Sequence, residues 1–148
     1  MKLTLVPIHL DGTTTPPIEQ DSELIQEVRE GTAQLFSKVA YVAPWIAYFA
    51  LDEAGIVVGT CAFKGPPENQ RVEIAYFTFP ENENRGIGTA MAAALVKIAL
   101  EADATVIIAA QTLPRRNASQ RILEKNGFKH VLTLDHPDDG TVYEWRVS

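Results

Sequence analysis

The stretch "EIAYFTFPENENRGIGTAM" (residues 73–91) joins a strand-like run to an alanine-rich segment with helical spacing. Gly86 and Gly88 stand where that helix begins, although a glycine inside a helix costs about 1 kcal/mol relative to alanine. A helix N-terminus leaves backbone N–H groups without intrahelical partners, and glycines there allow an anion to come close to them. Two interpretations follow: a tight strand-to-helix turn without a ligand, or a cradle for a phosphate group.

The hydrophobic pattern on both sides of this stretch predicts a single α+β domain over residues 1–148. Alternating or continuous apolar runs predict strands over 2–10, 45–52, 56–65, 71–79, 105–111, 128–136 and 141–147. Helical spacing of apolar residues predicts helices over 22–39, 86–102 and 115–127. The order of these elements gives one mixed sheet, with no visible linker that would divide the chain into two domains.

The composition argues against several kinds of partner. The net charge of −6 disfavours nucleic acid, and no segment approaches the ~20 apolar residues of a membrane span. The single Cys61 excludes an intramolecular disulfide, and we expect a cytoplasmic protein. Residues 81–130 nevertheless hold 7 Lys and Arg against 5 Asp and Glu, which favours a compact anionic ligand in this segment.

Two common nucleotide-binding motifs do not fit the glycine turn. The dinucleotide fingerprint G-x-G-x-x-G/A places a small residue at its sixth position, where this chain has Met91. The P-loop pattern requires a Gly-Lys-Ser/Thr sequence, and none follows these glycines. A phosphate-binding turn of another kind remains as the functional interpretation.

Residues 73–91 resemble the signature Q/R-x-x-G-x-G/A of the GNAT acyl-CoA N-acyltransferases, which lies between the fourth strand and the third helix of that family. The stretch "NASQRILEKNGF" (117–128) is similar to a second signature that is common in the RimJ/RimL-like branch. The resemblance is specific over residues 71–130 and rests on the order of elements elsewhere. It implies a three-layer α/β/α fold with a mixed, mostly antiparallel sheet of about seven strands, in which the fourth and fifth strands are splayed apart.

Three positions depart from the family pattern. Glu83 stands where the signature has Gln or Arg. Asn117 lies two residues before Ser119, and Arg116 occupies the position three before it that the branch often uses, so either Arg116 or Asn117 could face coenzyme A. Leu123 stands where many members carry a tyrosine that serves as general acid.

The resemblance implies that acetyl-CoA binds as a co-substrate. We expect no metal, because no ligand spacing recurs among the His and Asp residues of the chain. In the family the pantetheine arm inserts between the splayed strands, and the phosphates meet the glycine turn. The residues that would bind the co-substrate here are Phe77, Thr78, Phe79, Arg85, Gly86, Ile87, Gly88, Thr89, Ala90 and Asn117.

The implied activity is direct transfer of the acetyl group to a primary amine within a ternary complex. The acceptor would be a small molecule or a peptide amine, with neither nucleic acid nor membrane involved, and a homodimer is one possible assembly. The alternative is a catalytically degenerate member that serves as a CoA-binding sensor or interaction module. Acidic residues on the first predicted helix hint at a cationic acceptor, although a charged outer face explains them equally well: Asp21, Glu23, Glu27 and Glu30.

Two residues are candidates for catalysis. Strand alternation places Glu73 on one face with Ala75, Phe77 and Phe79. A carboxylate among apolar neighbours holds a proton more readily than one in water, which suits a general base near neutral pH, and a glutamate on this strand does that work in the histone-type members of the family. Ser119 is a weaker candidate to protonate the leaving thiolate, since a hydroxyl at a helix N-terminus is also a common cap.

We predict that Glu73→Gln lowers turnover ~10²–10⁴-fold at neutral pH, because the amide keeps the size of the side chain but accepts no proton. Binding of acetyl-CoA should be unchanged, and the variant should recover part of its rate at high pH, where free amine is abundant. Steady-state kinetics with saturating acceptor measure both effects. A variant that keeps more than about half of the wild-type rate would exclude Glu73 as the base.

Overall fold

The computed structural model describes residues 2–115 and 117–148. Its elements are β1 (Thr4–Pro7), α1 (Glu23–Lys38), β2 (Ala47–Leu51), β3 (Val57–Phe63), β4 (Arg71–Thr78), a short 3₁₀ helix η1 (Pro80–Asn82), α2 (Ile87–Ala102), β5 (Ile107–Thr112), α3 (Ala118–Lys125), β6 (Lys129–His136) and β7 (Gly140–Val147). Within these residues the strands form one seven-stranded sheet in the order β1-β2-β3-β4-β5-β7-β6. Neighbouring strands are antiparallel except for β4 and β5. The expected mixed, mostly antiparallel sheet is confirmed.

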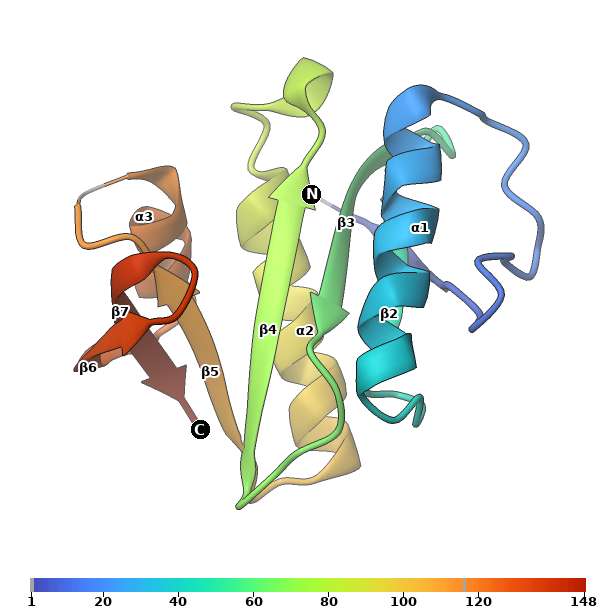
Figure 1. The fold of residues 1–148 in the computed structure, drawn as a ribbon. Coiled ribbons are helices and arrows are strands. Elements are labelled where there is room, and N and C mark those ends of the chain that lie inside the picture. The colour runs from blue at the N-terminus through green and yellow to red at the C-terminus, as the bar shows by residue number, and fades with distance from the viewer. Residues whose placement is uncertain (1, 116) are drawn as a thin grey trace.

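Helices cover both faces of the sheet. Figure 1 shows α1 in front of β2 and β3, whereas α2 and α3 lie behind the sheet. The core between these layers includes Phe49, Phe63, Met91 and Leu95, all fully buried. Cys61 belongs to this core, and burial raises the pKa of its thiol to about 12. No helix in the described part of the chain is long and apolar enough to cross a membrane.

The ends of the elements follow local capping. α1 begins after Ser22, whose side chain accepts a hydrogen bond from the Ile25 N–H at 3.1 Å. α3 is shorter than the predicted helix over 115–127, because Asn117 caps it and accepts a bond from the Gln120 N–H at 3.0 Å. β1 is likewise shorter than the strand predicted over 2–10.

The parallel pair at the centre of the sheet is short. Residues 71–73 of β4 pair with residues 107–109 of β5, and the register ends there although both strands continue. In Figure 1 the two strands meet at one end and are well separated at the other. The splayed strands expected from the family resemblance are confirmed. Beyond Glu73, β4 has no strand partner on its β5 side among the described residues.

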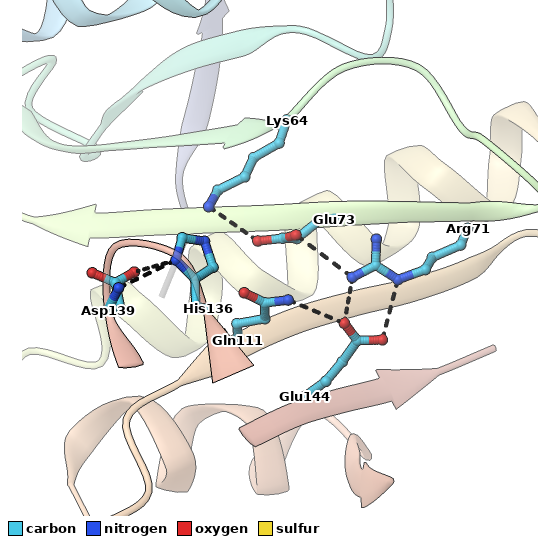
Figure 2. A network of polar contacts seen from close by, with 7 residues as sticks. All are labelled: Lys64, Arg71, Glu73, Gln111, His136, Asp139 and Glu144. Atoms are coloured by element: carbon cyan, nitrogen blue, oxygen red, sulfur yellow. Dashed lines mark hydrogen bonds and ion pairs between the residues drawn. The ribbon is translucent and has the colours of Figure 1, made fainter. Parts of the chain in front are cut away.

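A buried carboxylate joins the strands at this junction. Glu144 of β7 is only 1% exposed and receives two hydrogen bonds from the Arg71 guanidinium of β4, the one from Nε being 3.1 Å long. Arg146 Nε donates to the same carboxylate at 2.7 Å, and Gln111 Nε2 of β5 donates at 3.2 Å. Figure 2 shows Glu144 facing the fork of Arg71, with Gln111 beside it. Such bidentate charged pairs fix geometry as well as adding energy.

The pKa of Glu144 reflects two opposing effects. Burial alone would raise it, but hydrogen bonds from Arg71, Arg146 and Gln111 outweigh burial and hold the pKa below its ordinary value of 4.5. A carboxyl group whose pKa is lowered by folding stabilises the fold fully above its unfolded pKa. That contribution is lost as the pH falls through the lowered pKa of the folded state.

We predict that Glu144→Gln lowers the free energy of unfolding by about 3 kcal/mol at pH 7, because it removes the buried charge with which Arg71 and Arg146 both pair. Urea denaturation at pH 7 and below pH 4.5 measures the effect, and acid should narrow the gap between variant and wild type. The control is Glu101→Gln, which removes an exposed ion-pair partner of Lys97 on α2 and should leave stability unchanged. Equal stability of Glu144→Gln and wild type would contradict this role.

Candidate active site

A groove of about 450 Å³ lies where β4, the N-terminus of α2 and α3 meet. Its walls are formed by Tyr76, Phe77, Thr78, Glu83, Asn84, Gly86, Ile87, Gly88, Thr89, Ala118, Ser119, Arg121, Ile122 and Lys125. β4 contributes residues from beyond Glu73, where it has parted from β5. The part of β4 that lines the groove is therefore not paired with any described strand on its β5 side.

The N-terminus of α2 opens into this groove. Gly86 precedes the helix with φ +78° and ψ 12°, a left-handed conformation that favours glycine. A Cβ on Gly86 would meet no atom within 4 Å, so backbone conformation rather than lack of space explains this glycine. The N–H groups of the first turn have no intrahelical acceptors and carry the positive end of the helix dipole. They can therefore receive an anion.

Two cations of α3 line the groove together with that helix end. Arg121 and Lys125 are exposed and four residues apart, which places them on the same side of the helix. Glu83 is the carboxylate in the lining. Among the described residues, the groove thus combines a helix N-terminus with two cations against one carboxylate, and its chemistry suits a phosphorylated ligand.

Gly88 has a second reason to lack a side chain. A Cβ at this position would lie 2.5 Å from Cδ1 of Ile122 on α3 and 3.5 Å from Oγ1 of Thr78 on β4. Its absence lets α2 pack closely against both elements. Neither interpretation of the glycine turn from the sequence included this helix-to-helix contact, because it joins segments that are far apart in the chain.

The structure brings several of the predicted co-substrate-binding residues together. Ile87 is 1% exposed, so very little of its side chain reaches the groove. The predicted residues that line the groove are Phe77, Thr78, Gly86, Ile87, Gly88 and Thr89.

Arg85 and Phe79 lie away from the groove. Arg85 Nη1 donates to Asn82 Oδ1 at 2.6 Å, and its Nη2 lies 3.5 Å from Asp52 Oδ2, so the guanidinium turns toward the hairpin between β2 and β3. Phe79 is buried, and its N–H donates to the carbonyl of Val58 at 2.9 Å. In this arrangement neither residue presents a free donor to the groove.

The remaining predicted residues have local structural roles or fall outside the described chain. Ala90 lies inside α2, where its N–H donates to the carbonyl of Gly86 at 3.1 Å. Asn117 uses its side-chain oxygen to cap α3. Arg116, the other residue proposed to face coenzyme A, lies outside the described residues.

Tyr76 is a groove residue that the sequence interpretation missed. Its hydroxyl donates to the carbonyl of Ser119 at 3.3 Å, across the groove between β4 and α3. Burial raises the pKa of Tyr76 to about 12, with the hydrogen bond to Ser119 a smaller and opposite effect. Leu123 is fully buried and does not line the groove. Strand alternation placed Tyr76 on the face of Thr78, and this was the signal that could have identified it.

Glu73 faces the other side of β4, as alternation predicts. Lys64 Nζ lies 3.0 Å from one of its carboxylate oxygens, and Arg71 lies 3.5 Å from the other. Figure 2 shows the Glu73 carboxylate between these two cations. Its side chain is 15% exposed. The sequence interpretation considered only the apolar neighbours of Glu73 on this face. Alternation also places Arg71 there, two residues earlier on β4, whereas Lys64 comes from the end of the neighbouring strand.

The family of the chain follows from a comparison with known families. Residues 3–129 match the family described as Acetyltransferase (GNAT) domain. The match spans most of the chain, and the chain therefore belongs to the GNAT acetyltransferase family. A comparison with curated proteins finds no relative that matches.

Solved structures share the fold at low sequence identity. Aminoglycoside acetyltransferase AAC(6')-Ib in complex with coenzyme A is 22% identical with a TM-score of 0.59, and the match covers 70% of this chain and 65% of that one. A GNAT-family acetyltransferase from Bacillus anthracis is 20% identical with a TM-score of 0.62, over 80% and 74% of the two chains. A chimera of the spermidine N-acetyltransferase SpeG from Vibrio cholerae with hSSAT is 12% identical with a TM-score of 0.70, over 99% and 95%. The chain thus spans about two thirds of the length of the aminoglycoside enzyme.

We predict that Gly88 serves both helix packing and ligand approach, and two variants separate these roles. Gly88→Ala places a Cβ against Ile122 Cδ1, whereas Ile122→Val removes that methyl group and restores space for the Cβ. The double variant should fold as Ile122→Val does, yet bind coenzyme A at least tenfold more weakly, because the Cβ still occupies the groove. Calorimetry measures affinity and circular dichroism checks the fold. Equal affinity of the double variant and Ile122→Val would leave Gly88 with a packing role alone.

Proposed function

We propose that this protein transfers the acetyl group of acetyl-CoA to a primary amine, as an N-acetyltransferase formed by a single GNAT-like domain over residues 1–148. One observation carries the proposal. β4 lines the groove that suits a phosphorylated ligand, and it presents Glu73 on its opposite face. Glu73 is also the last residue of β4 that pairs with β5. A thioester lying along β4 would meet an amine that approaches from the side of Glu73. Membership of the GNAT family supports the same reaction.

The groove offers suitable groups to each part of coenzyme A. The N-terminus of α2, with Arg121 and Lys125, suits the pyrophosphate. On the β5 side of β4 beyond Glu73, no described strand pairs with the backbone. These backbone groups suit the amides of the pantetheine arm in the way that a sheet edge receives an added strand. The complex of the aminoglycoside acetyltransferase with coenzyme A supports this assignment.

The reaction requires an unprotonated amine and a stabilised leaving group. The lone pair of the amine nitrogen forms the new C–N bond at the thioester carbonyl carbon, while the carbonyl π electrons move to oxygen. When the carbonyl re-forms, the C–S bond breaks and the sulfur leaves with its electron pair as a thiolate. One proton must be taken from nitrogen, and the thiolate finally accepts one.

We assign the removal of a proton from nitrogen and the stabilisation of the thiolate to side chains on opposite faces of β4. We assign Glu73 the role of taking the proton from the amine, directly or through a water molecule. Tyr76 lines the co-substrate groove, and its raised pKa keeps the phenol protonated at neutral pH. By turning its hydroxyl from the Ser119 carbonyl to the sulfur, Tyr76 can donate a hydrogen bond to the developing thiolate, whereas the sequence interpretation had put forward Ser119 to protonate that thiolate. Ser119 remains in the groove as a second donor.

We also propose the RimJ/RimL-like branch, because residues 117–128 carry the signature that is common there. The aminoglycoside and spermidine acetyltransferases that share the fold are named for amine acceptors. Their names support an amine acceptor here, but these acceptors differ greatly in size and charge.

An assay with the purified chain, acetyl-CoA and a panel of amines tests the function. We expect release of free thiol that depends on the amine, with an equal amount of acetylated amine detected by mass spectrometry. Binding of coenzyme A without amine-dependent thiol release would favour the catalytically degenerate CoA-binding module. Absence of coenzyme A binding in calorimetry would contradict the proposal altogether.

We predict that Tyr76→Phe lowers turnover about ten- to a hundredfold, since a hydrogen bond to a charged group contributes about 1.5–3 kcal/mol. Affinity for acetyl-CoA should be nearly unchanged, because the phenyl ring remains. The wild-type rate should show no decline near pH 10, where an ordinary phenol loses its proton, because the pKa of Tyr76 is about 12. Turnover of Tyr76→Phe within twofold of wild type would remove Tyr76 from the reaction.

A further inference from the structure

A second cavity lies on the Glu73 side of β4. It has a volume of about 350 Å³ and is enclosed by the end of α1, the loop between β3 and β4, and the start of β4. Its walls are formed by Lys38, Val39, Ala40, Lys64, Gly65, Pro66, Glu68, Arg71, Val72 and Glu73. The volume is at the lower end of the ~300–1,000 Å³ typical of small-molecule sites. The cavity therefore suits a small acceptor.

The charges of this cavity do not suit a polycation. Its walls carry three cations, Lys38, Lys64 and Arg71, against the carboxylates of Glu68 and Glu73. Glu73 is already paired with Lys64 and Arg71. The acidic residues of α1 that hinted at a cationic acceptor are exposed and are not part of the cavity. A ligand with several positive charges would face like charges here.

We propose that the acceptor is a small α-amino acid, a chemical class that deepens the proposed acetyl transfer and rests on it. The amine of the acceptor replaces the Lys64 ammonium beside Glu73, and its carboxylate pairs with Lys64, with Lys38 nearby in the wall. The Lys64–Glu73 pair is thus opened by a ligand that carries both partner charges. The amine is held next to the carboxylate that takes its proton.

The two cations beside Glu73 differ in how readily they can move. The Lys64 side chain is 49% exposed, and a surface ion pair of this kind contributes only about 0–1 kcal/mol, so opening it costs little. Arg71 is 30% exposed and is held by two hydrogen bonds to the buried Glu144. Binding therefore displaces Lys64, while Arg71 continues to orient Glu73.

The test compares acids with amides. The proteinogenic amino acids are assayed as acceptors, and each one that is acetylated is compared with its carboxamide, which keeps the amine and lacks the negative charge. We expect wild-type kcat/KM to be at least tenfold higher for the acid. In Lys64→Ala this ratio should fall to near one, whereas Lys64→Arg should retain it. Both substrates need Glu73, so any effect of Lys64 on Glu73 cancels in the ratio.

Lys97→Ala is the matched control, because Lys97 is 77% exposed on α2 and pairs with Glu101 four residues later. Its acid-to-amide ratio should equal that of wild type. A wild-type ratio near one, or a ratio unchanged in Lys64→Ala, overturns the inference. Acetylation of spermidine or kanamycin without acetylation of any amino acid also overturns it and leaves the proposed function standing. Acetylation of none of these amines overturns the inference, and the thiol-release assay with peptide amines then decides the proposed function.

Discussion

The parting of β4 from β5 is the constraint on which the rest of this structure depends. The two strands pair over residues 71–73 and 107–109 and then separate. At this point the buried Glu144 carboxylate binds Arg71 of β4 and Gln111 of β5 from the adjacent strand β7. Because an unpaired buried charge is costly, these contacts hold β4, β5 and β7 together where the pairing of β4 with β5 ends. The free length of β4 beyond this junction is what a ligand can approach.

One strand therefore supplies chemistry to both faces of the sheet. Tyr76 and Thr78 face the groove beside α2 and α3, whereas Glu73 faces the cavity at the end of α1. The period-two alternation of β4 directs Tyr76 and Thr78 to one face and Glu73 to the other. β4 pairs with β5 up to Glu73 and has separated from it at Tyr76 and Thr78, so the two regions follow each other along one strand.

The local features of the fold were predictable, but the contacts between distant segments were not. Hydrophobic periodicity located the helices and strands, and the glycine turn marked the start of α2. The Arg71–Glu144 pair joins residues 73 positions apart, and the Gly88–Ile122 contact depends on how α3 packs. Asn117 matched a binding signature, yet its position directly before α3 makes it a cap. Single-sequence patterns carry no information on which of these tertiary contacts will form.

The surroundings of Glu73 also explain how a carboxylate between two cations could accept a proton from an amine, as proposed above. An incoming ammonium can approach only if one cation leaves, and Arg71 is fixed by Glu144 whereas Lys64 is half-exposed and held at one point. Lys64 orients the carboxylate, and in the proposed mechanism its displacement couples occupation of the cavity to exposure of Glu73 as the proton acceptor. Acceptor choice and proton transfer thereby depend on the same ion pair.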